Sequence, residues 1–266
     1  MEYVKKLEGK TNDGRKEALI NILNKKKHNI IKESYPVFGD FGENISVEIG
    51  QGKKEILLTA HYDVFKNSPG ANDNASSIAV LIDALDRLRN YKPRNKIKVI
   101  FFGDSETGGV GSKYHVAVYG ITNIVAVYNL ALTGMGDVVG VWPISYEIGG
   151  SKALKNLRQV LKKNKIRYEE AEKLPLFFSD HEPFRNAGLM DAFSLSLVPN
   201  KDMEATKKFV ENAGAKGFWM YLTGKIPLMF KLYHTKNDTS KYLKESSLKL
   251  MSDVVYKATL RLDSKS

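Results

Sequence analysis

The amino-acid sequence predicts an α/β fold, a single-domain three-layer sandwich in which a mostly parallel central sheet is flanked by helices. Short apolar runs typical of buried strands alternate along the chain with longer amphipathic stretches typical of helices. The chain has 266 residues, of which 42% are hydrophobic, and this is enough to bury one large core. No repeat, linker or shift in composition marks a second unit, so we expect residues 1–266 to form one domain.

The first half of the chain contains the clearest periodic segments. Residues 12–27 place apolar side chains at helical spacing, and residues 44–49 alternate as in a half-buried strand. Residues 55–60 and 96–102 are short apolar runs that indicate buried strands. Between these two runs, residues 75–90 have the pattern of a strongly amphipathic helix.

The second half continues the alternation of strands and helices. The pattern predicts strands at 123–130, 137–142 and 191–198, and helices near 111–119, 151–164, 180–187 and 244–262. Strands that are joined through helices pair in parallel, and the helices then cover both faces of the sheet. This order is the basis for the three-layer prediction.

The composition restricts the chemistry that the chain can carry. There is no cysteine, so disulfides and thiolate metal sites are excluded, and any metal ion must be held by His, Asp and Glu. The formal net charge is +11, which raises the alternative of a nucleic-acid or acidic partner. Aromatic residues do not interleave with basic runs such as 25–27 and 162–163, so we interpret these runs as solvated helix faces and expect no nucleic-acid partner.

The cellular location is predicted from two absences in the sequence. Residues 1–17 contain no apolar segment like that of a signal peptide, and no run approaches the roughly 18 apolar residues that a membrane span needs. We therefore expect a cytoplasmic protein that has no membrane partner. The sequence does not indicate the oligomeric state.

Four polar residues that could bind a metal ion lie where apolar segments end or where a helix is about to begin. They are His61 after the run 55–60, Asp73 before the helix near 75, Glu106 after the run 96–102, and His234 after the apolar stretch 227–233. Ligands of open α/β sheets bind outside the carboxyl ends of the strands, so we expect these residues on one rim of one sheet.

This set of side chains suits zinc. Zinc accepts imidazole nitrogen and carboxylate oxygen at about 2.0–2.2 Å, and a bridging carboxylate can hold two ions about 3.5–4 Å apart. Asp63 lies two residues after His61 and could accept the free N–H of that imidazole, which would fix its tautomer.

Each of these residues also has an ordinary structural explanation. A histidine after a strand is often a satisfied polar group, and an aspartate such as Asp73 before a helix is often its N-cap. Asp180 and His181 could line a substrate pocket or cap the helix that begins near them. The spacing alone leaves these alternatives open.

Five ordered motifs make the pattern specific. They are His61-Tyr62-Asp63, Gly70-Ala71-Asn72-Asp73-Asn74-Ala75-Ser76, Ser105-Glu106-Thr107-Gly108-Gly109-Val110-Gly111-Ser112, Ser179-Asp180-His181-Glu182-Pro183-Phe184 and Tyr233-His234-Thr235-Lys236-Asn237-Asp238-Thr239. From about residue 44 to its end, the chain resembles the zinc exopeptidase family of bacterial leucyl aminopeptidase, aminopeptidase Y and the glutaminyl cyclases. The resemblance implies a sandwich of the zinc-exopeptidase/phosphorylase-hydrolase type.

The resemblance also implies a role for each residue. His61 would bind a first zinc ion and His234 a second, Asp73 would bridge both, and Glu106 would complete the second site. Asp63 would orient His61. A cis peptide bond would follow the bridging aspartate, between Asp73 and Asn74.

Two positions depart from the family pattern. The first glutamate of the family's Glu-Glu pair is its general base, and Ser105 stands there; a serine hydroxyl is not basic near neutral pH. The family's aspartate ligand in an Asn-Leu-Asp segment is replaced by Ala131, whose methyl group cannot bind a metal. The first site keeps only His61 and the shared Asp73, so we expect one zinc ion rather than two.

The sequence therefore supports two hypotheses of function. One is a zinc-dependent, aminopeptidase-like exopeptidase that acts on peptides or amino-acid amides, in which Asp104 or a metal-bound hydroxide compensates for Ser105. The other is a degenerate relative that binds a metal ion or a peptide terminus without efficient turnover. Nucleotide binding is disfavoured because residues 108–113 fit neither phosphate-binding fingerprint, and no G-x-S-x-G elbow supports a serine hydrolase.

Overall fold

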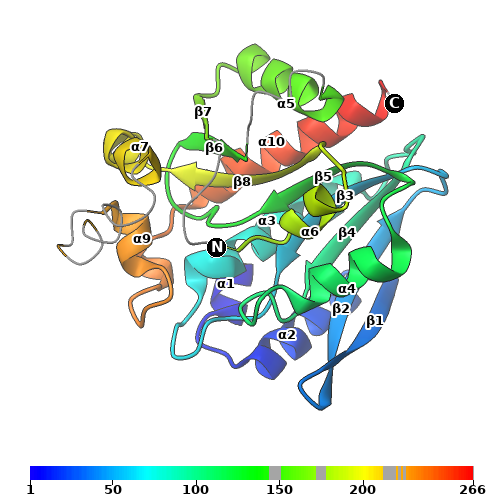
Figure 1. Ribbon diagram of the computed structural model, residues 1–266, viewed down its shortest axis with the longest axis horizontal. Helices are drawn as coiled ribbons and strands as arrows, with labels where there is room; N and C mark the ends of the chain where they lie inside the picture. Colours follow the sequence, from blue (N-terminus) through cyan, green and yellow to red (C-terminus); the bar gives the residue numbers. More distant parts are fainter. Residues whose placement is uncertain (144–150, 172–177, 212–219, 221–222, 224–225, 266) are drawn as a thin grey trace.

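An eight-stranded mixed sheet forms the centre of the computed structural model, with the strand order β1-β2-β4-β3-β5-β8-β6-β7 (Figure 1). The structure describes residues 1–143, 151–171, 178–211, 220, 223 and 226–265. The strands are β1 (Ile30–Val37), β2 (Asp40–Ile49), β3 (Glu55–His61), β4 (Lys96–Phe102), β5 (Ile124–Leu130), β6 (Val138–Trp142), β7 (Tyr168–Glu170) and β8 (Ala192–Val198).

The predicted α/β fold is confirmed, and the parallel part of the sheet is its centre. Strands β4, β3, β5 and β8 run parallel to one another. Antiparallel pairing begins on either side of them, where β2 pairs with β4 and β6 pairs with β8. The carboxyl ends of the four central strands therefore share one edge of the sheet, which is where the polar residues were expected.

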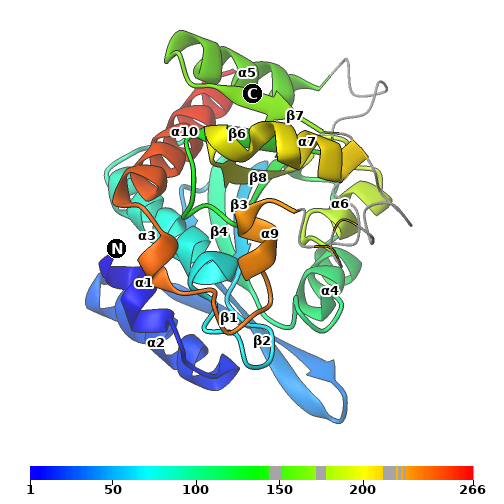
Figure 2. The same ribbon diagram turned by 90° about the vertical axis from the view of Figure 1, so that its left-hand side faces the viewer.

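Helices cover both faces of the sheet (Figure 2). They are α1 (Glu2–Leu7), α2 (Asn12–Lys25), α3 (Ser76–Leu88), α4 (Val110–Tyr119), α5 (Lys152–Lys163), α6 (Glu182–Asn186), α7 (Met203–Glu211), α9 (Leu228–Leu232) and α10 (Glu245–Asp263). Helices α3, α5 and α10 pack on one face together with α1 and α2, while α4 and α6 lie on the other.

The alternation of side chains along β3 accounts for the two layers of core. Ile56 and Leu58 point into the large cluster beneath α3 and α10, whereas Leu57 between them joins the smaller cluster that includes Phe184 of α6. Successive side chains of a strand point to opposite faces, so a strand that is apolar throughout is buried on both sides. This is the pattern that residues 55–60 display in the sequence.

The predicted strands and helices occur within a few residues of their expected bounds, but β1, β7, α1 and α7 were not predicted. Strand β1 is the longer of the two strands among these. It pairs along its length with a β2 that begins at Asp40 rather than at residue 44. The two strands are joined through Phe38 and Gly39, which have φ of 46° and 87°, as a tight two-residue hairpin turn requires. Charged residues and Pro36 in β1 conceal the alternation that marks a strand.

The segment before His234 was expected to end like a strand, and this expectation was wrong. Residues 228–232 form the short helix α9, with Pro227 at its N-terminus. Met229, Phe230 and Leu232 are buried, so the apolar run has the spacing of one helical turn rather than of a strand.

Among the residues that the structure describes, no helix has both the length and the apolar character that a bilayer crossing requires.

Candidate metal centre

Asp73 lies at the carboxyl edge of the sheet in the short π-helical segment η1 (Ala71–Ala75). Its backbone angles of −112° and 88° are not helical, and the Asp73–Asn74 peptide bond is cis, as the family resemblance implied. Ala75, not Asp73, precedes α3 as the N-cap residue, and Asp73 makes no side-chain capping bond there. The carboxylate is therefore available for other contacts.

Two histidines meet this carboxylate from opposite ends of the sequence. Nε2 of His61, the last residue of β3, is 3.3 Å from Oδ1 of Asp73. Nε2 of His234, which follows α9, is 3.3 Å from Oδ2 of the same side chain. Each imidazole thus faces a different oxygen of Asp73, which is the arrangement of a bridging carboxylate.

Glu106 completes the group from the turn that follows β4. Its Oε2 is 2.9 Å from Nε2 of His234. Asp63 ties this turn to His61, because its Oδ2 accepts the backbone N–H of Glu106 at 2.8 Å while its Oδ1 lies 3.3 Å from Nδ1 of His61. The carbonyl oxygen of Asp63 is also 3.1 Å from Nδ1. The structure thus brings together all five residues.

Two aromatic rings enclose the imidazole of His234. Phe65 stacks on one side, with ring centroids 4.2 Å apart and planes 4° apart. Tyr233 stacks at 3.7 Å with an angle of 20°. His234 itself has a φ of 59°, which lies in the left-handed region that few residues other than glycine adopt. These contacts hold Nε2 toward Asp73 and Glu106.

The charges of the cluster are strongly coupled. Burial alone would lower the pKa of His234, but the contacts with Asp73 and Glu106 outweigh it and raise that pKa to about 9. The pKa of His61 is likewise well above its usual value, despite burial, because of Asp63 and Asp73. Burial and the charge of Asp73 raise the pKa of Glu106 to about 7.

The residues fit a divalent ion such as zinc. Ligand atoms of His61, Asp73 and Glu106 all lie within 4.8 Å of one another, and Nε2 of His234 is 2.9 Å from Glu106 and 3.3 Å from Asp73. Within the described part of the chain, Oδ2 of Asp73, Oε1 of Glu106 and Nε2 of His234 are buried without a hydrogen-bond partner. Buried polar atoms normally have partners, so three converging ligand atoms without one fit the needs of a bound cation.

The two substituted positions lie beside the cluster. Ser105 immediately precedes Glu106, and its hydroxyl donates a hydrogen bond of 2.9 Å to Asp180. Ala131 directly follows β5 and contributes only a backbone bond, to the carbonyl of Leu195. Asp104, which we considered as a compensating base, accepts a hydrogen bond of 2.9 Å from the Tyr35 hydroxyl, so its carboxylate is turned toward β1.

Asp180 and His181 are both buried, and neither caps a helix. His181 occupies the N-cap position of α6 but makes no side-chain capping bond. Its ring stands edge-on to Trp142 at 5.0 Å, and burial lowers its pKa to about 3. Asp180 is bonded to Ser105, which precedes the cluster residue Glu106. His181 instead contacts the ring of Trp142, so of these two residues only Asp180 is connected to the cluster.

Asp238 supports the centre although the motif analysis assigned it no role. Its two carboxylate oxygens accept the backbone N–H groups of Asn72 and Asp73 at 2.8 and 2.9 Å, which holds the segment that carries Asp73. Burial raises the pKa of Asp238 to about 6 despite these two bonds. The sequence could have indicated this supporting role, because Asp238 belongs to the last of the five motifs.

Arg15 of α2 is the other supporting residue that sequence analysis missed. It is fully buried and donates from both terminal nitrogens to the carbonyl of Gly70, at 3.1 and 3.2 Å. Burial lowers the pKa of Arg15, while the charges of Asp63 and Asp73 oppose that shift. Arg15 lies on the same face of the helix as Leu19 and Ile22. A charged residue on an apolar helix face is the sequence feature that could have indicated a buried supporting role.

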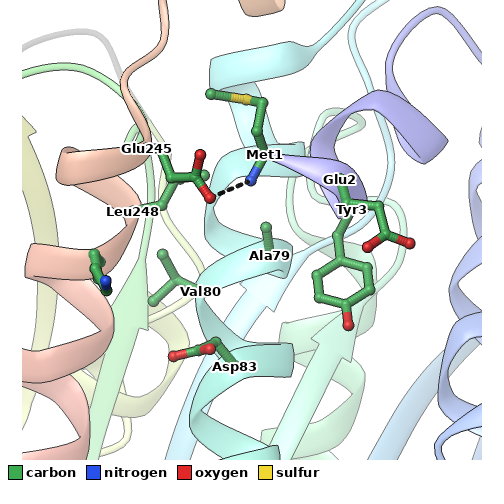
Figure 3. Close-up of a pocket in the computed structure, with 9 residues that line it drawn as sticks. Met1, Glu2, Tyr3, Ala79, Val80, Asp83, Glu245 and Leu248 are labelled. Carbon is green, nitrogen blue, oxygen red and sulfur yellow. Dashed lines mark ion pairs between the residues drawn. The ribbon is translucent and has the colours of Figure 1, made fainter.

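Two cavities lie away from this centre. One of about 260 Å³ lies between α1, α3 and α10, where the Met1 amine is 3.8 Å from Glu245 (Figure 3). The other, of about 430 Å³, lies along α1 and α2. Neither is lined by a residue of the cluster, so they contribute nothing to its chemistry.

Fold and site together define a class of protein: an α/β sandwich with a buried group of histidines and carboxylates at the carboxyl edge of its parallel strands. Residues 44–259 match the model of Peptidase family M28. Because this match covers well over half of the chain, the protein belongs to Peptidase family M28.

Individual relatives agree with this assignment. Aminopeptidase YwaD of Bacillus subtilis (strain 168) is 39% identical over 61 residues, which are 23% of this chain and 13% of that protein. The structure of BSAP, a zinc aminopeptidase from Bacillus subtilis, has a TM-score of 0.64 at 21% identity and covers 84% of this chain and 50% of that one. A glutaminyl cyclase of Porphyromonas gingivalis has a TM-score of 0.70 at 16% identity, with 100% and 96% covered.

The identities and coverages set the limits of the similarity between this chain and these relatives. At 16–21% identity, the two solved structures show that the fold is shared. The chain matches only a small part of the length of Aminopeptidase YwaD and half that of the zinc aminopeptidase.

Proposed function

We propose that this chain is a metal-dependent exopeptidase-type hydrolase, aminopeptidase-like, that acts on peptides or amino-acid amides. One observation carries the proposal: the two imidazoles of His61 and His234 face the two oxygens of the buried Asp73, with Glu106 against His234. Membership of Peptidase family M28 supports the reaction class.

Zinc is the proposed metal, with one ion rather than two. Asp73, Glu106 and His234 offer three protein ligands and an open position, which is the pattern of a catalytic zinc site. His61 has only the shared Asp73 beside it, because Ala131 stands where the resemblance implies another ligand. When bound, zinc supplies a Lewis acid that polarises the scissile carbonyl and makes a bound water more acidic.

The remaining residues of the centre would position these ligands. Asp63 fixes the orientation of the His61 ring and holds the backbone of Glu106 in the same contact. Asp238 holds the backbone at Asp73. Such supporting bonds to metal ligands typically change metal affinity or activity by about 10- to 100-fold when they are removed.

The proposed substrates are peptides or small amino-acid derivatives, and the basic surface is proposed to bind neither nucleic acid nor membrane. Cytoplasmic location stays a prediction of the sequence.

Two measurements test the proposed function together. Metal analysis of the purified protein is expected to find about one zinc per chain, since one complete set of ligands is present. Hydrolysis of amino-acid 4-nitroanilides is expected to stop with a chelator and to return when zinc or cobalt is added. The variant Asp13→Asn changes an exposed carboxylate on α2 and serves as the matched control. Protein that binds no divalent metal in either measurement would contradict the proposal.

A degenerate family member is the second candidate, and a specific observation favours it. Ser105 replaces the residue that the resemblance implies as general base, and loss of a positioned base typically costs about 10²–10⁴-fold in rate. This candidate predicts metal binding without metal-dependent turnover.

A further inference from the structure

Ser105 and Asp180 form a buried pair next to the metal centre. The two residues come from separate segments, the turn after β4 and the residues before α6, and they are 8% and 1% exposed. The Ser105 hydroxyl donates to Oδ2 of Asp180 at 2.9 Å. A hydrogen bond to a carboxylate is stronger than one between neutral groups, so this bond orients the hydroxyl.

Besides Ser105, the Ser112 hydroxyl and the charge of His61 favour the ionised form of Asp180, and both lower its pKa. The second oxygen of Asp180, Oδ1, is buried without a hydrogen-bond partner in the described residues, and none of the ion pairs found there includes Asp180. A carboxylate oxygen that is buried without a partner is costly, so Oδ1 requires an explanation. Burial outweighs the contacts that favour the ionised form and raises the pKa of Asp180, which brings the carboxylate closer to the range that suits a proton acceptor near neutral pH.

In the part of the chain that the structure describes, the other carboxylates close to Ser105 along the chain or in space have partners of their own. Asp104 precedes Ser105 in sequence, but its carboxylate is occupied by Tyr35 and lies against Gly42 of β2. Asp63 is occupied by His61 and by the backbone of Glu106. Ser105 stands at the position where the general base is missing, and its hydroxyl connects that position to the carboxylate of Asp180.

We propose that Ser105 and Asp180 together replace the missing base, with Ser105 as a relay and Asp180 as the final proton acceptor. This inference rests on the proposed hydrolase function. A water molecule held by Ser105 Oγ attacks the scissile carbonyl carbon with its oxygen electron pair. One O–H bond of that water breaks as a new O–H bond forms at Ser105 Oγ, and the original Ser105 proton moves to Oδ2 of Asp180.

The proton then leaves by the reverse route. Asp180 returns it to Ser105, and Ser105 passes its own proton to the departing amine nitrogen as the carbon–nitrogen bond breaks. The water oxygen and its second proton stay with the carboxylic acid product. Both residues end in their starting protonation states, so no further reactant is needed.

Paired substitutions test the relay through turnover. Ser105→Ala and Asp180→Asn are each expected to lower kcat by about 10²-fold, at the low end of the effect of a general base, with little change in KM. The double variant is expected to be about as slow as either single one, because groups that act as a unit have non-additive effects.

A second serine–aspartate pair, which is partly buried, provides the matched control. Ser151 donates to Asp191 at the start of α5, remote from the metal centre. Ser151→Ala and Asp191→Asn are expected to leave kcat unchanged. A wild-type kcat in Ser105→Ala would overturn the relay.

Binding of an amino-acid hydroxamate tests the proton acceptor without turnover. A hydroxamic acid binds a metal as its anion, so it gives up a proton when it binds. Calorimetry in buffers of different ionisation enthalpy counts the protons that reach the solvent. Wild-type protein is expected to retain the proton on Asp180, whereas Asp180→Asn and Ser105→Ala are expected to release about one more proton per hydroxamate.

The outcomes separate this inference from the proposed function. Zinc-loaded wild-type protein that releases as many protons as Asp180→Asn would overturn the relay and leave the hydrolase proposal standing. Protein that holds no zinc and hydrolyses nothing would overturn both, because the relay has no reaction to serve.

Discussion

The ring of Phe65 lies flat on the imidazole of His234, with centroids 4.2 Å apart and an angle of 4° between planes. Phe65 is 40% exposed, so its outer face is open to the surroundings while its inner face is covered by a proposed metal ligand. Aromatic pairs in contact contribute about 0.5–1.5 kcal/mol beyond their buried area. The contact therefore restrains His234, a proposed ligand that lies outside the helices and strands.

Removing this ring is expected to weaken zinc binding. Phe65→Ala frees one side of His234, and loss of a residue that orients a ligand typically lowers metal affinity by about 10- to 100-fold. Competition with a chromophoric chelator measures the change. Phe41→Ala removes a phenylalanine that is 72% exposed on the β1–β2 hairpin and should leave the affinity unchanged. Equal affinities in both variants would refute the positioning role.

Stability at acid pH is expected to depend on Asp263 at the end of α10. Its buried carboxylate accepts bonds from the backbone N–H groups of Arg94 and Asn95, from the Asn95 amide and from the Tyr91 hydroxyl. Burial alone would raise the pKa of Asp263, but these bonds outweigh it and lower the pKa below its usual value of 3.8. Asp263→Asn is expected to lower the free energy of unfolding by about 1–3 kcal/mol near neutral pH.

The sign of the pH dependence follows from that shift. The pKa is lower in the folded than in the unfolded state, so the stabilisation is present above the unfolded value and is lost as pH falls through the folded one. Urea unfolding of both proteins from neutral pH to about pH 3 should show the difference between them shrinking as acid is added. Asp253→Asn, which alters an exposed ion pair on the same helix, is the control. A difference that does not change with pH would contradict this assignment.

The sequence was sufficient to predict the sheet edge at which the site lies. Runs 55–60 and 96–102 are apolar throughout, which is the pattern of parallel strands buried on both faces, and such strands end on a common edge. His61 and Glu106 follow those runs and meet as expected. Placing Asp73 and His234 beside them depended on the ordered motifs, because neither residue follows a strand.

Supporting residues were harder to predict because they act through tertiary contacts. Arg15 lies far from the metal ligands in sequence, and only the folded packing of α2 against residue 70 brings its charge near Asp73. The Ser105–Asp180 bond joins residues 75 positions apart, and no periodic pattern records such a pairing. Propensity and periodicity describe local structure, whereas these contacts are properties of the closed fold.

Metal binding is expected to raise the thermal stability of the protein, and Asp73 is expected to be required for this effect. A ligand that binds only the folded state at about 100 times its Kd adds about 2.7 kcal/mol. For a chain of this size that corresponds to a rise in Tm of several degrees, at about 2–4 °C per kcal/mol. Asp73→Asn removes the carboxylate that both histidines face, so its Tm should not respond to zinc.

The exposed carboxylate of Asp13 again supplies the comparison. Asp13→Asn should keep the full response to zinc in the same differential scanning measurement. A zinc-dependent rise in Tm that persists in Asp73→Asn would place the metal elsewhere on the protein.

Restoring both substituted positions is expected to separate a working hydrolase from a degenerate relative. Ser105→Glu places a carboxylate beside Glu106, and Ala131→Asp supplies a further oxygen ligand at the end of β5, where His61 and Asp73 lack a third partner. A site with that ligand can hold a second ion, so the double variant should bind about two zinc ions per chain instead of one. Metal analysis and anilide hydrolysis are measured on the same samples.

If wild type is inactive and the double variant gains metal-dependent turnover, the chain is a degenerate member whose fold still supports the chemistry. If wild type already turns over and Ser105→Glu adds less than about tenfold, well below the effect of a missing base, then Ser105 and Asp180 already move the proton.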